Sequence, residues 1–449
     1  MSRRNRALDL VELAAELRKP IGIRAIEIGV DALDHLASLV PSSGRAAILT
    51  DAVPKTRSGV ELLPLVQERL SADVVVLHGD GGRVHADAAT LDEATDRVYG
   101  ASCLVTVGSG TITDIGKAVA ARLGGLAHVV VQTATSVNGF TDDQSVLLVN
   151  GVKRTTPTRW PDALVADAAV LAAAPAALNV AGVGDLAAMF TAPADWLLAT
   201  RLDMGGAYSP AIVDMVRRHG RSVLDAAPRL AKGDPDAAAH VAGVLALSGI
   251  SMGVAGTTAP ASGMEHTVSH LIEMAMNARG TDAAFHGAQV GVCTIAAARL
   301  WWRVAEKMRA GALELRFPDE AEMRDQVGAA FASLDPSGEM AAECWRLYSS
   351  KLSRWTRMRV GLESTDWEGL AASVADLLIE PQRLTTALSD AGAPVRFSQL
   401  DPPVERDLAR WALAHCHLMR DRFTVADLAF LAGMWDEAAV DSVLSEVGF

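Results

Sequence analysis

The sequence has few cysteines, few aromatic residues and no long uninterrupted apolar run. Its 449 residues include 4 cysteines, which lie far apart and form no CxxC pair. This spacing excludes a disulfide framework and a cysteine zinc site, and it indicates a reducing compartment. The N-terminal segment is interrupted by charges. No stretch has the run of about 20 consecutive apolar residues that a membrane-spanning helix needs. We therefore expect a cytoplasmic protein with no membrane partner.

The sequence also lacks an excess of basic residues. Lys and Arg number 41 against 54 Asp and Glu, which gives a formal net charge of −13. This balance argues against a nucleic-acid partner, because such binding rests on a basic surface. A phosphorylated small molecule remains compatible with it, since a few local cations suffice for one phosphate. Hydrophobic residues make up 50% of the chain, enough for the cores of two domains.

Short β-branched runs alternate with helical segments in the first part of the chain. The strand candidates are residues 46–50, 74–77, 104–107 and 129–131, and amphipathic stretches at 59–70 and 88–99 lie between them. Strands that alternate with helices need crossover connections, which produce a parallel sheet. Residues 1–180 are therefore predicted to form an α/β domain with a parallel sheet.

The pattern changes beyond residue 180, where strand signals end. Long helices are expected at 185–202, 237–252, 264–276 and 289–309, and shorter ones at 365–378, 403–416 and 424–431. Residues 181–449 are therefore predicted to form an all-helical domain. Residues 151–161 are expected to form an exposed excursion from the first domain.

A glycine-rich turn follows the third predicted strand. It begins with Gly108, Ser109 and Gly110, followed by Thr111 and Ile112. Glycine after a parallel strand allows a sharp turn, and the helix behind it directs free N–H groups at a phosphate. The turn lacks the third glycine of GxGxxG and the lysine spacing of a Walker loop. A tight strand–helix turn without a ligand therefore remains the alternative.

A second polar turn follows the next predicted strand and reads TATS at residues 133–136. Small hydroxyl side chains at the carboxyl end of a parallel strand suit the crevice where α/β sheets bind ligands. Upstream, Asp51 follows the first predicted strand. A carboxylate there can hydrogen-bond an adenosine ribose, which favours NAD over NADP, or it can simply cap a turn.

Carboxylate and imidazole side chains with metal-ligand spacing occur in the second half. Asp185 closes the segment GVGD, His266 and His270 are four residues apart, and His286 precedes another helix. The four-residue spacing places two imidazoles on one helix face. A lone histidine in an apolar helix is usually structural, but a carboxylate with two imidazoles is a common ligand set for a divalent metal. The cluster therefore predicts a metal site with positions open for substrate.

Taken together, these motifs resemble those of the sn-glycerol-1-phosphate dehydrogenases, in the iron-containing alcohol dehydrogenase and dehydroquinate synthase-like superfamily. The similar segments are GSGTITDIGK (108–117), TATSVNGF (133–140), GVKRT (151–155), AGVGD (181–185), SGMEHTVSH (262–270), HGAQVGVCT (286–294) and RDRFT (420–424). They occur in the family's order over nearly the whole chain. This order is more specific than any one motif.

The resemblance implies a role for each matching position. Residues 1–180 would form a Rossmann-like NAD-binding domain, and residues 181–449 a domain that binds metal and substrate. The nucleotide would contact both turns, together with Asp51 and Asp142; the turn residues are Gly108, Ser109, Gly110, Thr111, Ile112, Thr133, Ala134, Thr135 and Ser136. One divalent metal, zinc before iron or nickel, would bind Asp185, His266 and His286. Asp185 and His270 would be catalytic, and both would contact substrate together with Asn138 and Lys153.

The implied activity is reversible hydride transfer between a nicotinamide and a small ketone, such as dihydroxyacetone phosphate, or a related polyol. NAD is the implied cofactor with NADP as the alternative, and a homo-oligomer is expected. Two other readings are a sugar-phosphate cyclase on the same fold and a degenerate nucleotide-binding protein without turnover. The cyclase is disfavoured because its family usually has glutamate where this chain has Asp185.

Four positions around the expected substrate site depart from the family pattern. Asn138 stands where the family has an aspartate, and Asp142 where it has a serine. Ala259 stands where the family has an arginine, and Gln132 where it has a proline. A guanidinium is well suited to binding a phosphate, and position 259 lacks one in this chain. The cations at 153, 154 and 159 could replace it or form a solvated loop face. With the metal and glycine motifs intact, these departures indicate retained chemistry on a changed substrate.

Overall fold

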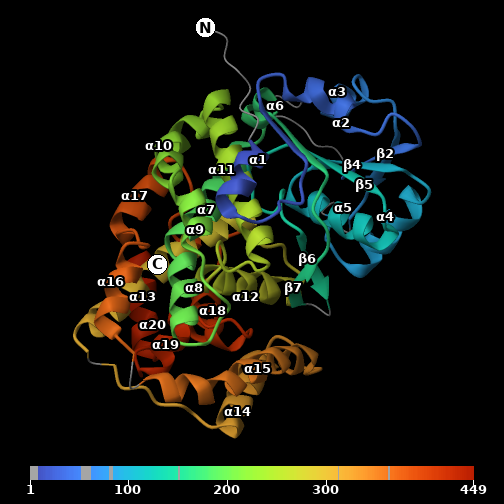
Figure 1. Ribbon diagram of the computed structural model, residues 1–449. Coiled ribbons are helices and arrows are strands. Elements are labelled where there is room, and N and C mark those ends of the chain that lie inside the picture. Colours follow the sequence, from blue (N-terminus) through green and yellow to red (C-terminus); the bar gives the residue numbers. More distant parts are fainter. Residues whose placement is uncertain are drawn as a thin grey trace.

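The computed structural model contains a six-stranded parallel sheet and an antiparallel hairpin at one end of the molecule, and a helical assembly at the other (Figure 1). It describes residues 9–51, 62–79, 84–149, 152–311, 313–362 and 365–448. The sheet strands are β1 (Ala25–Gly29), β2 (Ala46–Asp51), β3 (Asp73–Leu77), β4 (Cys103–Gly108), β5 (Ala127–Gln132) and β8 (Ala163–Asp167). Their order across the sheet is β1-β8-β5-β4-β2-β3. The four predicted strands are confirmed as β2 to β5, whereas β1 and β8 were not foreseen.

Successive residues of the central strands pack against different layers of helices. In β2, Ala47 and Leu49 face the apolar cluster of α4 (Ala88–Val98) and α5 (Gly110–Leu123). Ile48, between them, faces the cluster of η1 (Ala32–His35), α2 (Leu36–Leu39) and α3 (Leu62–Gln67). Strands buried on both faces read as continuous apolar runs, which is why these strands were visible in the sequence. Of the predicted helix at 59–70, residues 59–61 lie outside the described part.

The predicted exposed excursion at 151–161 is wrong. Residues 152–157 form a strand, β7 (Val152–Pro157), which pairs antiparallel with β6 (Gln144–Val149). Lys153 faces Leu148 across the hairpin, and Arg154 faces Leu147. Residues 152–156 read Val-Lys-Arg-Thr-Thr, so three of the five are β-branched, but two adjacent cations interrupt the run and no polar–apolar alternation marks it as a strand.

Helices make up the remainder of the chain. They are α6 (Ala168–Ala173), α7 (Ala176–Ala187), η3 (Ala188–Phe190), α8 (Ala192–Arg201), α9 (Pro210–Arg217), α10 (Gly220–Ala231), α11 (Pro235–Ala255), α12 (Met264–Ala278), α13 (His286–Arg309), α14 (Glu320–Ala332), α15 (Glu339–Leu362), α16 (Trp367–Ala375), α17 (Pro381–Asp390), η4 (Phe397–Gln399), α18 (Arg406–His415), η5 (Cys416–Leu418), α19 (Val425–Leu431) and α20 (Glu437–Val447); α1 (Leu10–Leu17) precedes the sheet. Within the described residues beyond 167 there is no strand, which confirms the fold class. A division into domains at residue 180 remains a prediction, and this position falls inside α7.

The single long helix expected at 185–202 is wrong. The chain forms the end of α7, the short turn η3 and then α8. Pro193 lies in the first turn of α8, where its missing N–H is tolerated, whereas within a continuous helix it would break a hydrogen bond. Asp185 therefore lies in the last turn of α7 rather than at the start of a helix.

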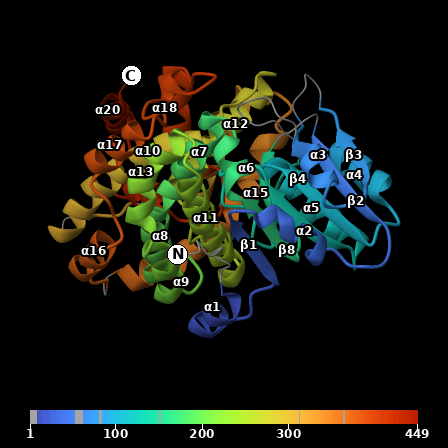
Figure 2. The ribbon, with the colours of Figure 1, turned by 90° about the horizontal axis from the view of Figure 1, so that it is seen from above.

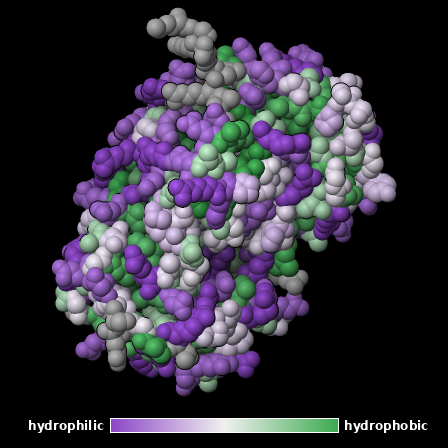
Figure 3. Space-filling view, in the orientation of Figure 1, coloured by the Kyte–Doolittle hydropathy of each residue, from purple (hydrophilic) through white to green (hydrophobic). Residues whose placement is uncertain are grey.

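The helix α11 joins the two halves of the molecule. It packs against β1 and β8 on one side and against α7, α9 and α10 on the other (Figure 2). By length and composition it resembles a membrane span, but 78% of its apolar window is buried within the protein. On the face in Figure 3, hydrophilic side chains are widespread and hydrophobic ones form small patches between them. The apolar character of α11 therefore serves the core.

Candidate active site

The glycine turn lies at the point where the strand order reverses. The chain runs outward from β2 to β3 and then returns to place β4 on the other side of β2. Ligands of open α/β sheets bind at such a reversal, beyond the carboxyl ends of the strands. Gly108 ends β4, and Ser109 is the N-cap of α5 without a side-chain cap. The first N–H groups of α5 are thus not capped by that side chain, as an anion site at a helix N-terminus requires.

The structure brings the other predicted nucleotide residues to the same end of the sheet. Asp51 ends β2, next to β4, and burial raises the pKa of its carboxyl. The N–H of Thr133 donates to the carbonyl of Gly108 at 3.2 Å, which joins the two turns. The Thr135 N–H and hydroxyl both bond to Asn179 of α7, so that residue is engaged within the protein. The buried Ser136 hydroxyl has no hydrogen-bond partner among the described residues.

Two glycines allow the helices that carry Asp185 and His286 to meet. A Cβ added to Gly184 in α7 would lie 2.2 Å from the carbonyl oxygen of Gly287 in α13. A Cβ on Gly287 would lie 2.1 Å from the carbonyl oxygen of Ala181. Real Cβ atoms do not approach backbone so closely, so the small residues beside the predicted ligands set the distance between the two helices.

The predicted metal ligands converge. His266 Nε2 lies 3.4 Å from Asp185 Oδ1, and His286 Nε2 lies 3.9 Å from the same oxygen. Asp185 Oδ2 accepts the Asn138 N–H at 2.8 Å, whereas the buried Oδ1 has no hydrogen-bond partner within the described part of the chain. An unpartnered carboxylate oxygen between two imidazole nitrogens is a donor set that a divalent cation completes. The residues therefore fit a metal of this type.

Two glutamates that the sequence analysis did not single out surround the histidines. Glu265 Oε1 lies 3.1 Å from His266 Nδ1, and Glu273 accepts from both His270 Nδ1 and His286 Nδ1, at 3.0 and 3.2 Å. Burial alone would raise the pKa of Glu273, but Lys153 and the two histidines hold it well below its usual range. Burial opposes protonation of His266, yet Asp185 and Glu265 raise its pKa to about 9. The cluster thus presents concentrated negative charge to a cation.

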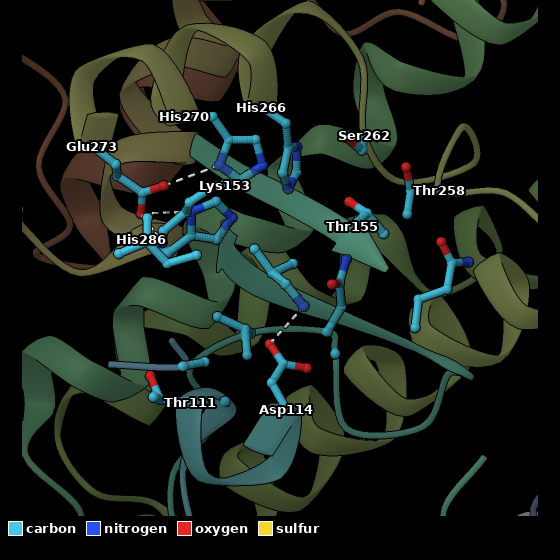
Figure 4. Close-up of a pocket in the computed structure, with 18 of the residues that line it drawn as sticks. Thr111, Asp114, Lys153, Thr155, Thr258, Ser262, His266, His270, Glu273 and His286 are labelled. Carbon is cyan, nitrogen blue, oxygen red and sulfur yellow. Dashed lines mark hydrogen bonds and ion pairs between the residues drawn. The ribbon is translucent and has the colours of Figure 1, made fainter. Parts of the chain in front are cut away.

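An open cavity of about 1240 Å³, including space continuous with solvent, joins the nucleotide turn to the histidines (Figure 4). Of the predicted site residues, those that line it are Gly110, Thr111, Asn138, Asp142, Lys153, His266, His270 and His286. Asp185 is buried just behind the wall. Thr133 lines a smaller, separate cavity, and Asp51, Gly108, Ser109, Ile112, Ala134, Thr135 and Ser136 are not among the described lining residues of either.

A buried lysine, Lys117, explains the setting of Asp142. The Lys117 ammonium lies 2.5 Å from Asp142 Oδ1 and 3.1 Å from Asp114 Oδ1, and it donates to the carbonyl of Gly139 at 2.8 Å. Burial raises the pKa of Asp142 to about 7, although Lys117 opposes the shift. A lysine seven positions beyond Gly110 on the same helix was visible in the sequence as the end of the GSGTITDIGK motif. It holds the loop at 138–142 through the Gly139 carbonyl and the Asp142 carboxylate.

The other departures from the family pattern also have identifiable surroundings. Gln132 donates its side-chain amide to the carbonyl of Ala134 at 3.0 Å, which braces the second turn. Ala259 packs against the helical core and presents no charge. Arg422 instead donates to the carbonyl of Ser262 and to the hydroxyl of Thr258, two residues of the cavity wall. A guanidinium from the RDRFT segment therefore supports the wall next to Ala259.

Comparisons with known proteins agree with this geometry. The family model of iron-containing alcohol dehydrogenases matches residues 27–175. A glycerol-1-phosphate dehydrogenase (NAD(P)+) of Bacillus licheniformis is 30% identical over 410 residues, which cover 90% of this chain and 88% of that protein. The Bacillus subtilis protein of the same description is 28% identical and covers 92% of each chain. A solved structure, a probable glycerol dehydrogenase from Sinorhizobium meliloti 1021, aligns over 93% of this chain and 96% of its own with a TM-score of 0.59 at 17% identity.

The fold and these matches place the protein among the iron-containing alcohol dehydrogenases, as an NAD(P)-dependent enzyme. Within that class, the chain belongs to the glycerol-1-phosphate dehydrogenase family. A nicotinamide cofactor and a metal are expected of a member of this family.

Proposed function

We propose that the protein transfers a hydride reversibly between NAD and a small ketone–alcohol pair, either dihydroxyacetone phosphate and glycerol 1-phosphate or a related polyol. The convergence of Asp185, His266 and His286 supports this most strongly, because His266 and His286 line the same cavity as Gly110 and Thr111 at the N-terminus of α5. The two Bacillus relatives are glycerol-1-phosphate dehydrogenases, whose named activity is of the same type. A divalent metal held by these three residues would supply Lewis acidity toward a carbonyl oxygen.

The residues of the chain have separate tasks in this reaction. The N-terminus of α5 binds the nucleotide pyrophosphate, and Asp51 favours an unphosphorylated ribose and hence NAD. One carboxylate and two imidazoles favour zinc, with iron or nickel as alternatives. The nicotinamide carries the hydride. Asn138 and His270 line the remaining part of the cavity, where they orient the hydroxyl groups of the substrate.

We assign proton movement to His270. Its Nδ1 faces Glu273, and its Nε2 has no hydrogen-bond partner among the described residues. Burial lowers the pKa of His270 to about 3, so the imidazole is neutral at physiological pH and Nε2 is an acceptor. The neutral Nε2 can accept a hydrogen bond from the substrate hydroxyl. We assign to it the relay of the proton released on oxidation, with the Glu273 carboxylate on Nδ1 stabilising the imidazolium that forms.

The charges on the cavity wall favour an uncharged ketone over its phosphate. Lys153 lies 3.0 Å from Glu273 Oε1, Lys117 is fully buried on Asp142 and Asp114, and Ala259 carries no charge. A phosphate dianion would have to break an existing ion pair to gain one of these ammonium groups, at the cost of a buried unpaired carboxylate. We therefore propose that the departures from the family pattern shift selectivity toward an unphosphorylated polyol.

A matched pair of substrates tests the activity and its selectivity. With zinc and NADH, dihydroxyacetone and dihydroxyacetone phosphate are compared by initial rates of NADH oxidation. We expect net NADH consumption and a higher kcat/KM for dihydroxyacetone. Efficient turnover of micromolar dihydroxyacetone phosphate would contradict the selectivity and leave the dehydrogenase intact. No net NADH change with either ketone would contradict the dehydrogenase itself, since a cyclase regenerates its cofactor.

A further inference from the structure

Glu273 is a buried carboxylate that serves two histidines of different function. One oxygen, Oε2, accepts from His270 Nδ1 at 3.0 Å. The other, Oε1, accepts from His286 Nδ1 at 3.2 Å and lies 3.0 Å from Lys153 Nζ. Its side chain is only 4% exposed, so solvent does not replace these partners. Figure 4 shows Glu273 to one side of the His270 and His286 imidazoles, away from His266.

This contact fixes the ring orientation of His286. An imidazole that donates from Nδ1 to a carboxylate leaves Nε2 unprotonated and free to bind a metal. His286 Nε2 is the atom directed at Asp185 Oδ1, at 3.9 Å. Glu273 therefore turns the ligating nitrogen of His286 toward the other ligands.

The same carboxylate fixes His270, which is not a predicted ligand. The rings of His270 and His286 are stacked, with centroids 5.2 Å apart and planes inclined by 15°. Because Glu273 accepts from Nδ1 of both, the two rings are held parallel with their Nε2 atoms free. One of these atoms belongs to the metal site and the other to the substrate side of the cavity.

These side chains do not form a second metal site. His270, Glu273 and His286 are close enough to hold an ion. The ammonium of Lys153, however, already occupies Glu273 Oε1, and a second dication there would be repelled by it. A carboxylate that hydrogen-bonds Nδ1 of a ligating histidine is instead the arrangement of an outer-sphere support.

We propose that Glu273 is a shared positioning residue, which aligns a metal ligand, His286, and the proton-transferring His270 as one unit. The inference rests on the proposed metal site and hydride transfer. Glu265 offers the matched contrast, because it contacts His266 Nδ1 at 3.1 Å and Thr191 Oγ1 at 2.9 Å but neither of the other two histidines. Loss of Glu273 should therefore impair two properties, whereas loss of Glu265 should impair one.

The experiment compares Glu273→Gln, Glu273→Asp and Glu265→Gln with the wild type. Zinc affinity and stoichiometry are measured by competition with a chelator. The kinetic constants kcat and KM are measured at saturating zinc, with NADH and dihydroxyacetone as substrates. Glutamine keeps the shape of the side chain but removes its charge and one acceptor. We expect one zinc per chain, roughly 10–100-fold weaker zinc binding in both Gln variants, and a kcat that stays depressed at saturating zinc in Glu273→Gln alone.

The outcomes separate the inference from the function on which it rests. Wild-type zinc affinity in Glu273→Gln, or full recovery of its kcat at saturating zinc, would overturn the inference while the wild-type enzyme still turns over. A second zinc lost with Glu273 would overturn it in favour of a second metal site. A wild type that neither binds zinc nor oxidises NADH would contradict the proposed function instead. If Glu273→Gln does not fold, Glu273→Asp, which keeps the charge but shortens the reach, is expected to show both defects in weaker form, and wild-type values in it would overturn the inference.

Discussion

At the scale of single residues, His128 shows how one buried imidazole makes folding depend on pH. It lies inside the sheet on β5, where Thr106 Oγ1 is 3.0 Å from Nε2, and Nδ1 has no hydrogen-bond partner among the described residues. Burial, followed by the charges of Lys117 and Arg159, lowers the pKa of His128 to about 3. An unfolded histidine titrates near 6.5, so the unfolded chain binds this proton first.

We therefore expect acid sensitivity that depends on His128. Above pH ~6.5 neither state binds the proton. As the pH falls from ~6.5 to ~3 only the unfolded chain binds it, so the free energy of unfolding decreases, by up to about 5 kcal/mol below both pKa values. His128→Gln should lose less of its own unfolding free energy between pH 7 and 4 than the wild type does, as measured by urea denaturation at each pH. The exposed His35→Gln serves as the control. If the unfolding free energy of His128→Gln falls with pH as steeply as that of the wild type, the prediction is contradicted.

At the scale of elements, the site depends on the close approach of α7 and α13. Gly184 and Gly287 lie where each helix meets the backbone of its neighbours, and Asp185 and His286 are the adjacent residues in the sequence. Widening of this contact would therefore move one metal ligand relative to another. An error of about an ångström is enough to weaken a preorganised site.

A pair of glycine substitutions tests this contact. Gly184→Ala should destabilise the protein and weaken zinc binding, because its Cβ would meet the Gly287 carbonyl at 2.2 Å. Gly243→Ala in α11 is the matched control, since no atom of the described residues lies within 4 Å of a Cβ built there. The control should be neutral or stabilising by up to about 1 kcal/mol. Thermal unfolding and chelator competition measure both effects, and equal behaviour of the two variants would refute the role of the contact.

Only some of these elements and site residues could be predicted from the sequence. Strands β2, β4 and β5 were predictable because they are apolar and buried on both faces, and the edge strand β3 because it contains three consecutive valines. His266 and His270 were predictable because their spacing matches a helix turn. The edge strand β1 and the hairpin strand β7 carry polar residues within short runs, so no periodic signal marked them. In the sequence Glu265 is next to His266, and Glu273 is three residues beyond His270. Only the fold shows that their carboxylates turn back onto the imidazoles.

At the scale of the whole molecule, the cavity is built by both halves of the chain. The sheet contributes Gly110 and Thr111 at the start of α5, the hairpin contributes Lys153, and the helical half contributes His266, His270 and His286. The proposed nucleotide residues and the proposed metal ligands therefore come from different halves of the chain, and we expect the two functions to be separable by substitution. A homo-oligomer and a cytoplasmic location remain predictions of the sequence.

Ligand-induced stabilisation should show this separation. At 100 times its Kd, a ligand that binds only the folded state adds about 2.7 kcal/mol, which raises Tm. Gly110→Ala places a Cβ 2.7 Å from Val137 Cγ2 at the nucleotide turn and should lose the shift with NADH but keep that with zinc. Asp185→Asn should lose the Tm shift with zinc but keep the shift with NADH. Loss of both shifts in either variant, with normal unfolding without ligand, would contradict two separate sites.

Anomalous diffraction at the zinc edge tests whether Asp185, His266 and His286 hold a metal. In crystals grown with zinc and NAD, we predict one peak per chain within roughly 2.0–2.2 Å of Asp185 Oδ1, His266 Nε2 and His286 Nε2. Glu273 should lie outside the coordination sphere, on the Nδ1 side of His286. A peak bound by other residues, or no peak at these three, would contradict the account.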